Sequence, residues 1–201
     1  MEQRGQVVRR VLSPARAATR ERLIEAAIEL ATEGGYDAVG IRPVAAHAGV
    51  SVPTAYQHVS SKDELLTEAL LALGARSTAD VRERTPAGRS PADRLTFVFR
   101  RILREAAAKP LLYQALYRAY LASAPTLLAI DGQAGFGPEK AAWIGATLRA
   151  GDTGGHDEEA IESASRILSM LFLGAMMSVA AGRDAGEAGD VLEDATRRLL
   201  P

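Results

Sequence analysis

The chain has 201 residues, 47% of them hydrophobic and 24% charged, which is an ordinary balance for a globular protein with a sizeable core. It contains no cysteine, so disulfides, zinc–thiolate sites and thiol catalysis are excluded. No uninterrupted apolar run reaches the roughly 20 residues that cross a bilayer, and the N-terminal arginines precede no apolar signal-peptide core. We therefore expect a cytoplasmic protein with no membrane partner.

The net charge of −1 hides an uneven distribution along the chain. Residues 1–20 hold five arginines against one acidic residue, whereas residues 21–64 hold three basic residues against seven acidic ones. Any nucleic-acid contact must therefore come from a few placed side chains and the N-terminal arm. This arm, residues 1–15, is predicted to be flexible and either to follow DNA or to remain solvated.

Helical periodicity and capping residues predict three short helices at the start of the chain. The first begins at Thr19, whose hydroxyl can cap it, and ends at Gly34-Gly35. The second covers about 41–48, and the third runs from the cap Ser51 to about Val59. A helical domain is therefore expected over residues 16–64.

Residues 61–64, Ser-Lys-Asp-Glu, form a capping box that opens a long fourth helix linking this domain to a larger one at 65–201. After a loop at 85–91, the pattern predicts five more helices, at about 91–108, 110–123, 125–150, 157–182 and 187–199. Pro110 and Pro125 are expected to begin the second and third of these. Since no strand pattern occurs, the predicted fold is all-α with about nine helices.

The spacing of Ala45, Gly49 and Ala55 fits a helix-turn-helix. Small residues let two helices cross closely, and glycine provides the backbone freedom of the turn. Many structural helical corners share this spacing, so the spacing alone leaves both interpretations open.

The surrounding residues are more specific. Gly49-Val50-Ser51, Pro53-Thr54-x-Tyr56-x-His58 and Ser61-Lys62-x-x-Leu65 resemble the DNA-binding domain of the tetracycline-repressor family, over about residues 19–70. The resemblance implies a third helix in the major groove of DNA. It also implies a dimeric, ligand-responsive repressor that binds a palindromic operator and is released by a hydrophobic small molecule.

The same resemblance assigns DNA-binding roles to nine positions. Thr54, Tyr56 and Lys62 match phosphate contacts, and Ser51 caps the reading helix. Arg42 is similar to a base-reading or phosphate-contacting position. Four residues match groove-facing positions: Val52, Pro53, Gln57 and His58. Chemically, Gln57 suits adenine and Arg42 suits guanine. Two alternatives stay open: Tyr56 as a core residue and His58 as a C-terminal cap.

The larger domain carries two apolar features. Tyr113, Tyr117 and Tyr120 share one helix face. They predict an apolar ligand pocket with orienting hydroxyls, or else an ordinary core with tyrosines at its edge. Four further residues are expected near them: Phe97, Trp143, Met170 and Met177.

Residues 167–181 are apolar on nearly every side of their helix, so both a pocket wall and a partner subunit are expected to cover them. The last helix adds an apolar stripe. A symmetric homodimer would present two DNA-binding domains to an inverted repeat. The predicted dimer-interface residues are Ile167, Leu171, Leu192, Ala195 and Leu199.

No catalytic constellation, cofactor motif or metal-ligand spacing appears, so we expect neither an enzyme nor a cofactor. The segment His156-Asp157-Glu158-Glu159 is interpreted as a loop leading into a helix, with acidic residues at its positive end, rather than as a metal site. The alternative function is a helical carrier of apolar ligands that has no DNA role.

A narrower resemblance concerns residues 34–39, 109–112 and 118–120, which are similar to the actinobacterial repressors of sterol catabolism. This resemblance implies a lipid-like, steroid or acyl-CoA ligand.

Overall fold

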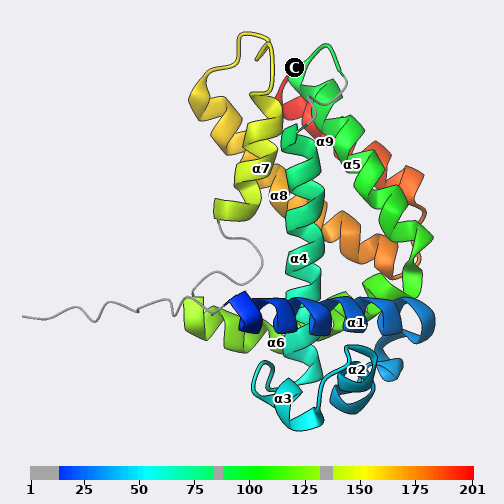
Figure 1. Cartoon of the computed structure of the whole chain (residues 1–201). Helices are drawn as coiled ribbons and strands as arrows, with labels where there is room; N and C mark the ends of the chain where they lie inside the picture. The colour runs from blue at the N-terminus through cyan, green and yellow to red at the C-terminus, as the bar shows by residue number, and fades with distance from the viewer. Residues whose placement is uncertain (1–13, 84–87, 132–137) are drawn as a thin grey trace, which may run out of the picture.

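The computed structural model describes residues 14–83, 88–131 and 138–201 (Figure 1). Over these ranges the chain is all-α without strands, as predicted. Its nine helices are α1 (Pro14–Ala38), α2 (Ile41–His47), α3 (Val52–Tyr56), α4 (Lys62–Glu83), α5 (Pro91–Ala108), α6 (Pro110–Asp131), α7 (Pro138–Leu148), α8 (Glu158–Ala180) and α9 (Ala185–Leu199).

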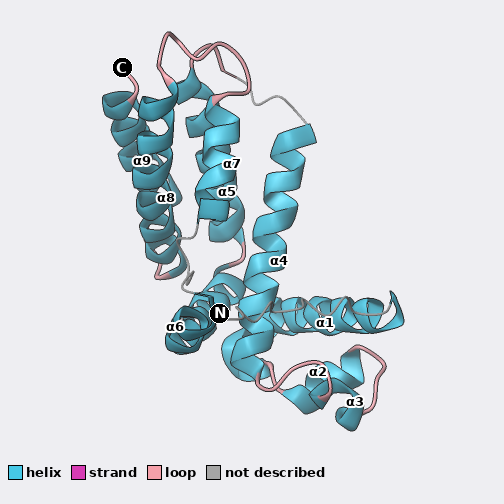
Figure 2. Ribbon diagram, turned by 90° about the vertical axis from the view of Figure 1, so that its left-hand side faces the viewer, coloured by secondary structure: helices cyan, strands magenta, loops and turns pink. Residues whose placement is uncertain are grey.

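The helices form two parts joined by α4 (Figure 1). We call α1–α3 the head and α5–α9 the body. Helix α4 begins beside α3 and runs up along the body, while α6 lies across the base of the body and packs against both α1 and α4. Figure 2 shows α8 and α9 side by side on one flank of the body, and α2 and α3 at the far end of the head.

Helix α1 departs from its predicted start. It begins at Pro14 rather than Thr19, and the Thr19 hydroxyl donates to the Ala15 carbonyl inside the helix at 3.0 Å. The cap prediction was wrong because residues 15–18 are strong helix formers that continue the helix backwards. The predicted break is present: Gly35 has φ 69° and ψ −160°, after which one further turn reaches Ala38.

The prediction that Pro125 begins a helix was also wrong. Helix α6 runs through Pro125 to Asp131, so the predicted helix 125–150 is divided between α6 and α7. An interior proline removes one backbone donor. The apolar helix formers that follow, residues 127–130, keep the chain helical despite that loss. Residues 84–87 of the predicted loop lie outside the described residues.

Three aromatic rings form the centre of the body. Phe99 of α5 stacks on Phe172 of α8 with ring centroids 4.9 Å apart, and Trp143 of α7 meets both rings edge-on at 5.9 and 5.6 Å. Offset-stacked and edge-to-face pairs are favoured because of the ring quadrupoles. This cluster ties α5, α7 and α8 together.

A buried arginine holds the end of α7. Arg94 of α5 is almost fully enclosed and donates to the carbonyls of Leu148 (2.9 Å) and Asp152 (2.7 Å). The carbonyls at a helix C-terminus lack partners within the helix and carry partial negative charge. The guanidinium therefore fixes the end of α7 and the loop that follows.

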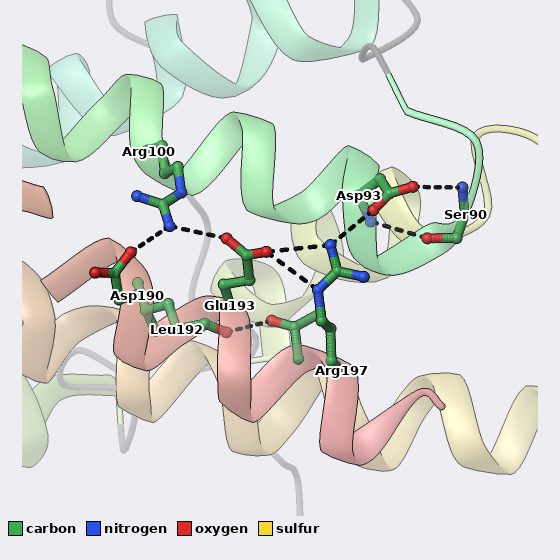
Figure 3. Close-up of polar contacts among 8 residues, drawn as sticks. Ser90, Asp93, Arg100, Asp190, Leu192, Glu193 and Arg197 are labelled. Carbon is green, nitrogen blue, oxygen red and sulfur yellow. Dashed lines mark hydrogen bonds and ion pairs between the residues drawn. The ribbon is translucent and has the colours of Figure 1, made fainter. Parts of the chain in front are cut away.

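An ionic ladder joins α5 to α9 (Figure 3). Arg100 donates to Asp190 at 2.5 Å and to Glu193 at 2.8 Å, while Arg197 donates to Glu193 and to Asp93, both at 3.1 Å. Hydrogen bonds from Arg100 and then Arg197 hold the pKa of Glu193 below its usual value. Because these groups are largely solvated, each pair adds little to the free energy of folding. Together they fix the position of α9 along α5.

The backbone at Gly35 leads to a first prediction. Gly35→Ala forces a Cβ into a conformation that L-residues rarely adopt, so it should lower the free energy of unfolding by about 1–3 kcal/mol. The matched control is Gly74→Ala in α4. An added Cβ there meets nothing within 4 Å, and the change should stabilise the protein by up to about 1 kcal/mol. Urea unfolding followed by circular dichroism measures both. Equal effects at the two sites would contradict the assignment of strain to Gly35.

Candidate functional site

The turn between α2 and α3 is tightly determined. Gly49 has φ 65°, and the Val50 N–H donates to the Ala45 carbonyl at 2.9 Å. Ala45 and Ala55 are fully buried, as expected where two helices cross closely. The predicted helix-turn-helix is therefore present in its geometry as well as in its spacing.

Helix α3 is capped as predicted but is shorter. The Ser51 hydroxyl accepts from the Thr54 N–H at 3.2 Å and shares a second hydrogen bond with the Thr54 hydroxyl at 2.7 Å. The helix ends at Tyr56 rather than near Val59, because Gln57 already forms its C-cap. Val59 is nevertheless buried and holds the following turn on the core.

The outer face of α3 presents polar and aromatic groups. Pro53, Tyr56 and Gln57 are exposed, and Val52 and Thr54 are half-buried at its edges. Tyr56 is 58% exposed, which excludes the alternative of a core tyrosine. Arg42 is exposed in the first turn of α2, which packs against α3.

Lys62, at the start of α4, is half-buried against Tyr36. Its Nζ lies 3.7 Å from the centroid of the Tyr36 ring and donates to the Tyr36 carbonyl at 3.3 Å. The predicted capping box is present in modified form. The Ser61 hydroxyl accepts from the Glu64 N–H at 3.1 Å, while the Glu64 carboxylate accepts from the Ser60 N–H at 2.8 Å rather than from Ser61.

Helix α1 brings arginines to the end of α3. Arg20 donates to the His58 carbonyl at 3.0 Å and forms an ion pair with Glu68 of α4. Burial, with help from Arg16 and Arg20, lowers the pKa of His58. In the sequence, these two arginines stood out only as part of the N-terminal positive charge. Their spacing of four residues, one helical turn, was the available signal.

Another side of α1 carries charges of both signs. An open groove of about 790 Å³ between α1, α2 and α4 is lined by Glu21, Arg22, Glu25, Glu29, His47 and Arg76, among others. Arg76 pairs with Glu25 and His47 with Glu29. Because these charges largely cancel, the groove is not a basic phosphate site. Among the described residues, no group of three or more His, Asp or Glu is placed to hold a metal ion.

The predicted pocket residues are divided between the interior and the surface. Tyr113, Tyr117 and Tyr120 are buried, so the alternative in which they face outward is excluded. Burial raises the pKa of Tyr113 to about 12 and raises that of Tyr117 further. Trp143 is buried in the aromatic cluster, and Met177 is half-buried against the core.

Two members of that set are corrected by the structure. Phe97 is 45% exposed and Met170 is 61% exposed, so neither lines the interior with the tyrosines. Both lie on the outer faces of their helices, a property that depends on how each helix is rotated in the bundle. For Met170, that rotation cannot be derived from the almost uniformly apolar pattern of α8. For Phe97 a signal was available, because it lies opposite the buried apolar stripe of the amphipathic α5, which includes Leu95 and Val98.

The predicted dimer residues are divided as well. Ile167 and Leu171 are exposed, and Ala195 and Leu199 are half-buried. Leu192 is only 1% exposed, because α9 turns this residue into the core of its own chain, so its assignment to a subunit interface was wrong. Val191, its neighbour, is exposed instead.

Part of the chain is similar in sequence to known bacterial regulators. Residues 23–69 match the family model described as bacterial regulatory proteins, tetR family. The chain is 38% identical over 109 residues to the HTH-type transcriptional repressors KstR of Rhodococcus jostii and of Mycobacterium tuberculosis. That match covers 54% of this chain and 50% of each relative, so the chain spans about half the length of the curated relatives it matches.

Two solved structures resemble nearly the whole chain. A TetR transcriptional regulator from Rhodococcus sp. RHA1 is 28% identical with a TM-score of 0.73, covering 92% of this chain and 97% of that one. FadR of Thermus thermophilus, solved in complex with lauroyl-CoA, is 26% identical with a TM-score of 0.69, covering 90% and 93%. The helix-turn-helix segment therefore matches the tetR family model, and the nine helices of the described residues have the architecture of these two solved regulators.

Proposed function

We propose that the protein is a ligand-responsive transcriptional regulator that binds operator DNA through α3 and acts as a repressor in the cytoplasm. The observation that carries this proposal is the exposed polar face of a short, capped helix set on a fully buried crossing at Ala45 and Ala55. A rigid platform of this kind places side chains in a major groove without further ordering. No such platform is required by the alternative, a carrier of apolar ligands.

The proposed contacts follow from side-chain chemistry. Gln57 presents a donor and an acceptor that match the adenine edge, and Arg42 suits guanine or a phosphate. Tyr56 and Lys62 flank this face and supply phosphate contacts, together with the Thr54 hydroxyl, while His58 faces the groove. Val52 and Pro53 offer apolar surface to thymine methyl groups.

We also propose a homodimer formed through α8 and α9. Ile167, Met170, Leu171 and Val191 are large apolar side chains left exposed on these neighbouring helices. Helix α8 is also long and apolar enough to cross a membrane, with a mean hydropathy of 1.4, but length and composition alone are weak support for a span. A second copy would cover this surface and present two heads to an inverted repeat.

The proposed effector is a hydrophobic molecule bound in the body beside the tyrosine face of α6. Buried Tyr113, Tyr117 and Tyr120 offer hydroxyls within an apolar surrounding, as ligand sites commonly do. The lauroyl-CoA complex of the Thermus relative and the similarity to KstR favour an acyl-CoA or a related lipid. Binding would release DNA by favouring a different placement of the heads.

The DNA proposal predicts different effects for two variants. Gln57→Ala should reduce the preference for operator over random DNA, costing about 1–3 kcal/mol on the operator alone. Lys62→Ala should weaken both DNAs similarly and lower the salt slope of binding by about one. Fluorescence anisotropy at several salt concentrations measures both, using duplexes from the region upstream of the protein's own gene and neighbouring promoters.

The matched control is Arg104→Met in α5, which removes one charge from a side chain that donates to its own helix at the Arg100 carbonyl. It should bind DNA as the wild type does. Absence of salt-sensitive, sequence-preferring binding by the wild type would reject the regulator in favour of the carrier.

The dimer proposal predicts that Met170→Glu produces monomers, because it buries a carboxylate in an apolar interface. Leu121→Glu, which changes an exposed leucine on α6, should leave the assembly unchanged. Sedimentation velocity distinguishes the two species. A dimer that survives Met170→Glu would place the interface elsewhere.

The effector proposal predicts that lauroyl-CoA raises the unfolding temperature and weakens operator binding, while acetyl-CoA does neither. A ligand at 100 times its dissociation constant stabilises the folded state by about 2.7 kcal/mol. Differential scanning fluorimetry measures the first effect and anisotropy the second, and native mass spectrometry of freshly purified protein reveals any retained lipid. Identical responses to both thioesters would contradict an acyl-chain site.

A further inference from the structure

We propose that Arg118 of α6 is a positioning residue for the DNA contact of Lys62 and acts through the ring of Tyr36. This inference rests on the proposed function and adds to it a route from the body to one phosphate-contacting side chain. The three residues come from α6, from the end of α1 and from the start of α4, so their meeting joins the helices on which the head is mounted.

Tyr36 is held in place from several directions. It follows the break at Gly35, and its hydroxyl donates to the Asp63 carboxylate in the first turn of α4 at 2.6 Å. That hydrogen bond is the main reason why the pKa of Tyr36 is raised. The side chain of Leu111, from α6, lies 3.8 Å from where a Cβ on Gly35 would stand. The ring is therefore a fixed platform between the head and α6.

The cationic side chains of Lys62 and Arg118 both lie over the Tyr36 ring. The Lys62 Nζ lies 3.7 Å from the ring centroid, and the guanidinium carbon of Arg118 lies 3.8 Å from the same centroid. Arg118 also approaches Asp37, with Nη1 and Oδ1 3.9 Å apart. Both distances to the ring are within the range of cation–π attraction. Tyr36 thus connects a side chain of the body to the proposed phosphate contact.

Arg118 has no role in the core that would explain its position. Its side chain is 63% exposed, and the interior face of α6 is formed by buried neighbours such as Tyr117 and Ala119. What Arg118 does is stack on Tyr36, and this contact restricts the ring on which Lys62 rests. A lysine held near its bound position loses less conformational freedom when it meets a phosphate.

Arg118 lies on the same helix as the tyrosines of the proposed effector site, so a change at that site can reach the ring of Tyr36. The same helix carries Tyr113, Tyr117 and Tyr120 into the body, so a displacement of α6 moves these side chains and Arg118 together. If Arg118 leaves the ring, Lys62 loses part of its support. DNA affinity then falls without any change in the groups that touch the bases.

The test is a double-mutant cycle on operator binding. Arg118→Met should weaken binding about two- to five-fold, the factor that a cation–π contact at an exposed site supports. Arg118→Lys, which keeps a cation near the ring, should restore most of the affinity. In the Lys62→Ala background, Arg118→Met should have no further effect, because its target is gone.

Tyr36→Leu provides a second test, because it removes the ring. In the Tyr36→Leu background, Arg118→Met should cause no further loss of operator affinity. Arg104→Met controls for the loss of one positive charge from the body. Circular dichroism melting curves check that each variant is folded, so a binding defect in a folded variant is attributed to positioning.

The outcomes separate this inference from the proposed function. If the wild type binds no operator, the proposed function fails. If the wild type binds but Arg118→Met binds equally well, only the positioning role is rejected. An equal loss with and without Lys62 rejects it too, since Arg118 would then act by another path. A Lys62→Ala variant with wild-type affinity overturns the inference as well.

Discussion

The structure depends most on the packing of α6 against both α1 and α4 (Figure 2). Leu112, Ala115, Leu116 and Ala119 are buried along this helix, and α1 and α4 carry buried apolar residues of their own, such as Leu23 and Leu65. Close-packed interiors transmit displacement rather than absorb it. Because one helix contacts both elements that hold the head, the orientation of α3 is tied to the state of the body.

Charged side chains are unevenly distributed over the head. On one side α1 offers Arg16 and Arg20 near the end of α3, whereas on another its three carboxylates line the open groove beside Arg22 and Arg76. A polyanion is attracted to the first side more than to the second, where the charges largely cancel. The nearly neutral total charge is therefore compatible with DNA binding, since the sign of the local field matters more than the sum.

Features fixed by local rules could be predicted from the sequence. The cap at Ser51, the turn at Gly49 and the bounds of α5 follow from short-range backbone chemistry, and the structure has all three. The failures at Thr19 and Pro125 arose where a local signal was outweighed by the helix-forming residues around it.

The remaining errors concern long-range geometry. The direction of Met170 depends on the rotation of α8, which is apolar on nearly every side. Leu192 lies on an apolar stripe of α9, and such a stripe does not show whether its own chain or a second copy covers it. Phe97 differs, because it lies opposite the buried stripe of α5 and its exposure could have been predicted. No feature of the sequence indicated that Tyr36 and Arg118 are in contact. The residues lie far apart in the chain and share no periodicity, so only the folded backbone brings them together.

The aromatic cluster of the body has a practical consequence. Trp143 is the single tryptophan of the chain, and its ring packs against those of Phe99 and Phe172. Its helix, α7, lies far from α3 (Figure 1). Its emission therefore reports on the body, whereas loss of helical ellipticity reports on the head and the body together. Following both signals through one denaturation would show whether the packing of α6 makes the two parts unfold as one cooperative unit.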